Sequence, residues 1–318
     1  MSTIRNVAWF GTGKTGLPVL EAVAASGKFN IKLLIRETTA DRERKLPPNI
    51  QTVYVDFARP STLVDALRKQ DAVVVFTNFG PGSGLDKLQL PLIGAAIEAG
   101  VKLFVPSEWA PDTAGGNAAT PSHIGPATVP PHGVLGAKRA VHNYLFARAA
   151  EGAISFTLLY PGVVLQSALK VGMLQLDFNQ KLALLPDGGI HPFSTTSIRT
   201  LCAAVIGLLS KYPKTRNRLL YVADGVTTVR ELVTVVERVT QEKWTRKAFS
   251  IAESKERAEA RIREGIYGRE EFMSVLQLPF FGGLTVWKKL DNSLLGISDE
   301  QLVDPRDEMA RIVKQLTQ

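Results

Sequence analysis

Short apolar runs alternate with helix-like segments along the first half of the chain. Apolar strands are expected at 5–11, 30–37, 50–57, 71–79, 101–109 and 154–162, and helices at 16–26, 61–69, 86–99 and 135–150. Strands that are apolar on both faces and separated by helices are typical of a parallel sheet covered on both sides. The pattern therefore predicts an α/β fold, a Rossmann-type doubly wound parallel sheet.

The second half of the chain is less regular. We expect a buried helix at 198–210, a strand at 217–224, a helix at 227–241, a charged amphipathic helix at 253–272 and a final amphipathic helix interrupted by Pro305. The sheet domain is expected to span residues 1–160, and a smaller C-terminal region residues 161–318. Residues 198–224 are expected to pack back on the sheet.

Residues 106–133 interrupt the strand–helix order. The segment is rich in proline and glycine, which excludes regular structure over its length. A long loop at the carboxyl end of a strand in an open α/β sheet lies where ligands bind. It is either a lid or a disordered insertion. Trp109, His123 and His132 favour the lid, because such side chains are unusual in solvated linkers.

Composition and charge exclude several classes of protein. The 318 residues are 45% hydrophobic and 21% charged, as in ordinary globular proteins. The single cysteine, Cys202, excludes a disulfide framework, and no signal peptide or apolar run of about 18 residues is visible, so a cytoplasmic protein without a membrane span is expected. The net charge is +8, but basic and acidic residues are mixed, as in 254–271, which argues against nucleic-acid binding.

The turn after the first strand has the pattern G-x-G-x-x-G. Its residues are Gly11, Thr12, Gly13, Lys14, Thr15 and Gly16. Between a strand and a helix, the first glycine permits the tight turn, the second lets the backbone approach a pyrophosphate, and the third permits close packing. A P-loop is excluded, because Ala8 stands where that motif needs a glycine. The turn predicts a dinucleotide.

The end of the second strand indicates which dinucleotide binds. Arg36 lies twenty residues after Gly16, where NAD-binding folds place an acid on the ribose. A guanidinium there binds a 2′-phosphate instead, and Lys45 could add a second charge, so NADPH is the predicted cofactor. Asp56 either meets the adenine edge or caps a turn. Three further residues end the fourth strand, where ribose and phosphates pass in this fold: Thr77, Asn78 and Phe79.

Several segments together resemble the isoflavone-reductase-like and NmrA-like group of atypical short-chain dehydrogenases. They are the turn at 11–16, Leu34-Ile35-Arg36-Glu37, Phe104-Val105-Pro106-Ser107-Glu108-Trp109, Lys138 and Leu294-Leu295-Gly296. The resemblance implies a Rossmann domain, NADPH, and reduction of an aromatic or polyketide-like small molecule. It also implies a second class of function, a dinucleotide-sensing regulator without turnover.

Lys138 matches the lysine that, in the reductases of this group, begins the helix after the long loop and sits near the nicotinamide. Val141 matches the branched residue three positions on. A lysine there can donate a proton or stabilise an oxyanion, so Lys138 is the predicted catalytic residue. The group often has an arginine pair where this chain has His142 and Asn143. His142 lies one helical turn past Lys138 and shares its face. It could tune that lysine, but we expect a surface histidine.

The substrate pocket is expected to form from 109–135, 163–195 and 260–285. Its candidate wall residues are Trp109, His132, Phe178, His191, Phe193, Phe280, Phe281 and Trp287. Aromatic residues also serve as core, so both interpretations are open. Val134 stands four residues before Lys138, which excludes a Tyr-x-x-x-Lys pair. No metal ion is predicted.

Overall fold

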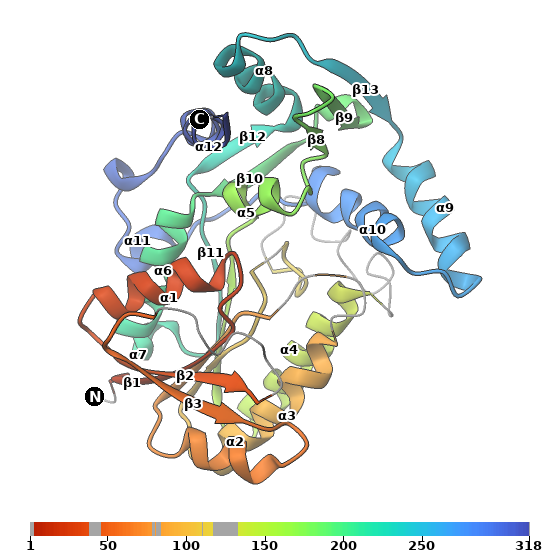
Figure 1. Ribbon diagram of the computed structural model, residues 1–318. Coiled ribbons are helices and arrows are strands. Elements are labelled where there is room, and N and C mark those ends of the chain that lie inside the picture. Colours follow the sequence, from red (N-terminus) through yellow and green to blue (C-terminus); the bar gives the residue numbers. More distant parts are fainter. Residues whose placement is uncertain are drawn as a thin grey trace.

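The computed structural model describes residues 3–37, 46–77, 80, 84–109, 111–116 and 133–317. In Figure 1 the N-terminal half forms a sheet flanked by helices, and much of the C-terminal half forms a second layered region at the top of the view. Among the helices in these ranges, none is both long enough and apolar enough to cross a membrane.

Within the described residues, a seven-stranded parallel sheet lies at the centre, in the order β11-β6-β5-β4-β1-β2-β3. Its strands are β1 (Asn6–Phe10), β2 (Asn30–Arg36), β3 (Ile50–Val55), β4 (Ala72–Val75), β5 (Leu103–Val105), β6 (Ser155–Tyr160) and β11 (Arg218–Tyr221). The predicted α/β fold is confirmed. The strand order reverses between β1 and β4, and ligands of such sheets bind at the carboxyl ends of the strands at this reversal.

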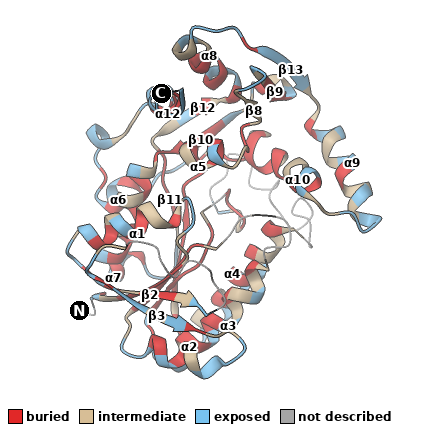
Figure 2. Ribbon diagram, viewed as in Figure 1, coloured by how far each residue is buried: buried red, intermediate tan, exposed pale blue. Residues whose placement is uncertain are grey.

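Helices cover both faces of this sheet. On one face lie α1 (Gly16–Ala25) and α6 (Ile198–Ser210), and on the other α2 (Pro60–Leu67), α3 (Leu85–Glu98) and α4 (Val134–Ala150). Side chains of β1 alternate between the two resulting cores: Val7 and Trp9 belong to one, Ala8 and Phe10 to the other. Burial on both faces explains why the strands are continuously apolar. Figure 2 shows this burial along the sheet.

Two smaller sheets lie in the second region, in the orders β12-β10-β7 and β13-β9-β8. Their strands are β7 (Val163–Val164), β8 (Leu176–Asp177), β9 (Leu182–Pro186), β10 (Pro192–Thr196), β12 (Gly225–Thr228) and β13 (Thr245–Phe249). The remaining helices are α5 (Leu165–Lys170), α7 (Tyr212–Thr215), α8 (Val229–Thr240), α9 (Ile251–Arg263), α10 (Arg269–Phe281), α11 (Asn292–Leu295) and α12 (Pro305–Thr317), with short 3₁₀ turns at Asp187–Gly189 and Asp299–Gln301.

Two helix predictions are wrong in detail. The single helix expected at 253–272 is two helices, α9 and α10, because Gly265 adopts a φ of +84° just after α9 and Gly268 caps the start of α10. Pro305 does not interrupt the last helix but begins it. Proline suits the first helical position, because the N–H that it lacks has no partner within the helix there.

Gly207 on α6 is a sensitive packing position. A Cβ atom there would lie 2.2 Å from the carbonyl oxygen of Leu295 on α11. We therefore expect Gly207→Ala to lower the free energy of unfolding by about 1–3 kcal/mol, as overpacking does. Gly94→Ala on α3 is the matched control, since a Cβ there meets nothing within 4 Å and alanine favours the helix. Urea unfolding of both variants checks this; equal stabilities would contradict it.

Candidate functional site

The glycine turn lies at the reversal point, between β1 and α1. Gly11 has a φ of +101°, and a Cβ there would lie 1.6 Å from the carbonyl oxygen of Phe76. A Cβ at Gly16 would lie 2.6 Å from the Gly11 oxygen. These two positions therefore accept glycine alone, because of backbone conformation and close packing. Around Gly13, by contrast, no atom of the described residues lies within 4 Å of a Cβ, so within the described part of the chain the turn faces open space there.

The start of α1 is suited to an anion. No side chain caps its N-terminus, and its first turn holds no acidic residue. The Thr15 hydroxyl lies instead 2.7 Å from the hydroxyl of Ser167 on α5, and Lys14 Nζ donates to the Lys170 oxygen at 3.2 Å. The half-buried Thr12 completes the turn. The positive end of the helix dipole thus faces the open side of the turn, as in phosphate sites.

Arg36 ends β2 and is exposed at the same sheet edge. The neighbouring carboxylates are engaged by Arg59, whose guanidinium lies 3.1 Å from Glu37 and 2.8 Å from Asp56. Asp56 also accepts from the Ala58 amide at 2.9 Å, so it caps a turn. The bond from Arg59 holds the pKa of Asp56 below its usual value. Of the two interpretations for Asp56, the contacts favour the turn cap.

Three aromatic rings stack beneath the turn. Trp9 and Phe76 have ring centroids 5.3 Å apart, and Phe76 and Trp109 stack at 4.0 Å with planes 4° apart. Trp109 Nε1 donates to the Val75 oxygen at 2.8 Å. Trp109 has a φ of +27°, a strained conformation that these contacts hold. The stack places an aromatic surface directly below the strand reversal.

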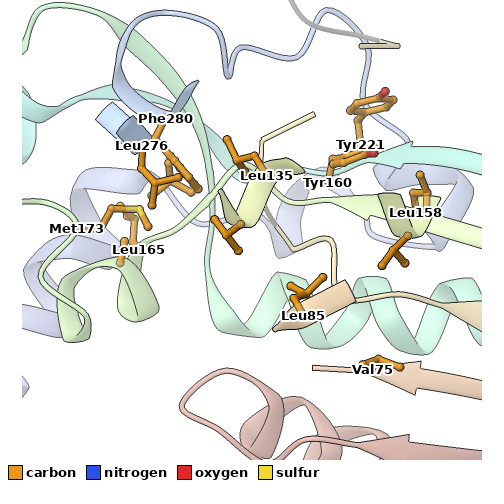
Figure 3. Close-up of a cluster of buried hydrophobic side chains, with 14 of the residues drawn as sticks. Val75, Leu85, Leu135, Leu158, Tyr160, Leu165, Met173, Tyr221, Leu276 and Phe280 are labelled. Carbon is orange, nitrogen blue, oxygen red and sulfur yellow. The ribbon is translucent and has the colours of Figure 1, made fainter. Parts of the chain in front are cut away.

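A cavity of about 120 Å³ opens beside the turn and the aromatic stack. Its lining residues come from both halves of the chain: Thr15, Phe76, Thr77, Leu85, Ser107, Trp109, Lys138, Gly162, Val163, Val164, Ser167, Ala168, Val171, Met173 and Phe280. Most are apolar, so the cavity suits an apolar or aromatic molecule held by few polar groups. Figure 3 shows Phe280 and Met173 at one end of the buried cluster, with Leu276 and Leu165.

The predicted wall residues divide between cavity and core. Trp109 lines the cavity. Phe193 is fully buried against Phe281, at 5.1 Å between centroids, and Phe178 packs on Trp244 at 4.9 Å. Among the described lining residues none of these three phenylalanines appears, whereas Phe280, next to Phe281, does. Their contacts favour the core interpretation for Phe193 and Phe281, whereas Phe178 is only partly buried, and contact of any of the three with a substrate stays a prediction. Four predicted residues lie outside the described part of the chain: Lys45, Asn78, Phe79 and His132.

Lys138 reaches the cavity from the second turn of α4 and is only 2% exposed. Its Nζ donates to the carbonyl oxygen of Ser107 at 2.6 Å and to that of Glu108. Burial lowers the pKa of Lys138 from 10.5 to about 8, and the Glu108 carboxylate opposes part of this decrease. Lys138 is therefore mostly protonated at neutral pH and gives up its proton more readily than an ordinary lysine.

The surface position expected for His142 is wrong. The side chain is buried, one helical turn after Lys138. Its Nδ1 lies 3.3 Å from Glu108 Oε1, and its ring stacks on Phe146 at 5.1 Å. Thr113 donates to the other Glu108 oxygen at 2.8 Å. The expectation failed because spacing along a helix places residues on one face but does not show which segment covers that face.

The segment that carries Ser107 and Glu108 is held on several sides. The Ser107 amide donates to Gln89 Oε1 at 2.7 Å, and the Thr77 amide donates to the Ser107 hydroxyl at 3.0 Å. Gln89 is 1% exposed. The sequence pattern alone assigns no role to Gln89 or Glu108. Polar residues within otherwise apolar segments were the available signal, because such groups are buried only with partners.

Comparison with known proteins agrees with this geometry. Residues 6–279 match the NmrA-like family. An oxidoreductase of Aspergillus flavus, aprR, is 28% identical over 243 residues, which is 76% of this chain and 76% of that protein.

Two solved structures share the fold. AtPrR2, solved with NADP+ and (+)-pinoresinol, has a TM-score of 0.73 and 20% identity and covers 98% of this chain and 99% of its own. An isoflavone reductase has a TM-score of 0.72 and 17% identity, over 99% of this chain and 100% of its own. At these identities the likeness extends to the fold alone.

Proposed function

Because this chain belongs to the NmrA-like family, we propose that it is an NADPH-dependent oxidoreductase that reduces an aromatic or polyketide-like small molecule. One observation carries the proposal. A buried lysine with a lowered pKa lines an apolar cavity beside a glycine turn that faces open space. The A. flavus relative is named an oxidoreductase, and AtPrR2 was solved with NADP+, which supports this proposal.

The turn at 11–16 would hold the pyrophosphate of the cofactor. Its fit rests on the open space at Gly13 and on the uncapped, acid-free start of α1. Arg36 would bind the 2′-phosphate. Arg59 pairs with Glu37 and Asp56 nearby and so offsets part of their negative charge, which would otherwise repel the phosphate. Residues 1–160 would thus bind the dinucleotide, while 161–318 mainly shape the substrate site.

Bound NADPH supplies a hydride, and the protein supplies position, charge and a proton. Lys138 would donate its proton, or present its positive charge, to the atom that gains electron density when the acceptor is reduced. The two carbonyl oxygens of Ser107 and Glu108 fix the ammonium in place. The apolar walls exclude water, which strengthens this interaction.

The walls also suggest the kind of acceptor. Trp109 and Phe280 offer aromatic surfaces, and Met173 a polarisable, adaptable one. Purified protein should therefore oxidise NADPH in the presence of aromatic carbonyls, quinones or benzylic ethers, followed as the loss of absorbance of the reduced nicotinamide. Tight NADPH binding without turnover across such a panel would favour the dinucleotide-sensing regulator instead.

Arg36 is expected to set the preference between cofactors. Arg36→Ala should weaken NADPH binding by about 1.5–3 kcal/mol, the value of a hydrogen bond to a charged group, and leave NADH binding nearly unchanged. Calorimetric titration with both cofactors measures this. Arg238→Ala, which removes an exposed positive charge from α8, is the control for general electrostatics. Equal losses for NADPH and NADH in Arg36→Ala would refute the assignment.

A further inference from the structure

Next to Lys138, behind the wall of the cavity, lies a buried polar cluster whose side chains have no role in the proposed reaction. It consists of Glu108, Thr113 and His142, each between 1% and 2% exposed. The two Glu108 carboxylate oxygens point to different partners, Thr113 at 2.8 Å and His142 at 3.3 Å. A buried carboxylate is costly unless it is paired and hydrogen-bonded, so this arrangement needs an explanation.

The contact with Glu108 determines where the His142 proton lies. An ionised carboxylate can only accept hydrogen bonds, so Nδ1 of His142 must carry the proton in this contact. The ring is held at the correct angle by stacking on Phe146. Thr113 donates from the other side. Glu108 thus has a hydrogen-bonding partner on each carboxylate oxygen.

The position of Glu108 couples this cluster to the cavity. Its backbone oxygen accepts from Lys138 Nζ, and its side-chain charge acts on the same ammonium. We propose that Glu108 and His142 are positioning residues, a buried carboxylate–imidazole pair that fixes the carbonyls beneath Lys138 and provides the negative charge that keeps Lys138 protonated. This inference rests on the proposed function for its catalytic meaning, but the charge coupling can be measured without turnover.

Other charged groups near the pair are engaged elsewhere. Asp112 accepts from the Tyr221 hydroxyl at 2.8 Å, and Tyr160 stacks on Tyr221 at 5.2 Å. The Arg139 guanidinium contacts the Thr113 carbonyl at 3.5 Å. Burial and the nearby carboxylates raise the pKa values of both tyrosines, so they are neutral at ordinary pH. Among the described residues, Glu108 is the carboxylate whose charge acts on the Lys138 ammonium.

The test is an NMR titration of Lys138 in the full-length protein labelled with ¹³C at lysine Cε, with the Lys138 signal assigned by its loss in Lys138→Ala. Glu108→Gln keeps the shape of the side chain and removes its charge. We expect it to lower the pKa of Lys138 from about 8 to about 7 or below, as loss of a neighbouring opposite charge does. If turnover is found, the alkaline limit of kcat should move by the same amount, with NADPH affinity unchanged.

A second pair of variants covers the case in which Glu108→Gln does not fold. His142→Phe keeps the stacking on Phe146 but removes the donor, whereas His142→Asn restores a donor near the position of Nδ1. The first should lower the Lys138 pKa and the second should return it toward about 8. An unchanged Lys138 pKa in Glu108→Gln or in His142→Phe would overturn the inference. A shifted Lys138 pKa in a protein that shows no turnover would support the charge coupling and count against the proposed function.

Discussion

Lys138→Ala is expected to lower kcat by about 10²- to 10⁴-fold, the usual contribution of a positioned proton donor, and to change NADPH affinity little. The effect on kcat is expected to be much larger than the effect on NADPH affinity, because the Lys138 ammonium acts on charge that develops only during reduction. In the wild type, kcat should fall as the pH rises through about 8, since the protonated form that donates is lost above its pKa. The measurements are steady-state kinetics against pH and direct NADPH titration.

Two further variants at this position separate charge from shape. Lys138→Met retains length without charge and should lose turnover as fully as alanine. Lys138→Arg keeps the charge but gives up a proton far less readily, because arginine stays protonated in proteins. It should therefore recover activity only if the positive charge, rather than the proton, is what the reaction needs. Wild-type turnover in Lys138→Ala would show that Lys138 is a bystander and that the proton comes from the 106–133 segment or from water.

Gly13→Val is expected to abolish dinucleotide binding. The valine side chain would fill the space in which the pyrophosphate approaches the turn, at a cost of at least two charge-assisted hydrogen bonds of about 1.5–3 kcal/mol each. That corresponds to roughly a 10²-fold to 10⁴-fold rise in Kd for NADPH and NADH alike. Calorimetric titration of both cofactors measures the effect.

The protein itself should tolerate this substitution, which makes the test clean. A Cβ at Gly13 meets nothing within 4 Å, unlike one at Gly11 or Gly16. Thermal unfolding should therefore resemble that of the wild type, and Gly94→Val, with equally open surroundings on α3, controls for the added branched residue. Retained affinity in a folded Gly13→Val variant would mean that the cofactor binds elsewhere.

The first half of the fold was predictable because its signals are local. Most strands of the central sheet are largely buried and are visible as apolar runs, and β1, β3, β4 and β5 are each followed by a helix. Among the exceptions are β2, which is followed by β3, and the edge strand β3, which has exposed positions. The glycine turn is similarly contained in six residues. The strands were nevertheless predicted too long at their carboxyl ends, as at β5, where Pro106 follows the last ladder residue.

The second half was harder because its order depends on distant pairs. β7 has two residues and pairs with β10, and β9 pairs with β13 about sixty residues later. Strands so short carry no periodicity of their own. Which phenylalanines line the cavity and which pack in the core also depends on distant parts of the chain. Phe280 and Phe281 are adjacent, yet Phe280 lines the cavity and Phe281 packs on Phe193. The sequence predicted a role for Lys138, but it did not predict that His142 is buried against Glu108.

The joining of β11 to the edge of the central sheet has a consequence for how the chain matures. β6 ends at Tyr160, but the strand that pairs with its outer edge, β11, is complete only when synthesis reaches Tyr221. The helix that packs on α1, α6, also lies in this later part of the chain. A nascent chain or a fragment that ends near residue 160 would expose an unpaired strand edge and the apolar side of α1. Such surfaces bind chaperones or aggregate, so we expect the N-terminal half to need the later residues before its sheet edge and α1 are covered.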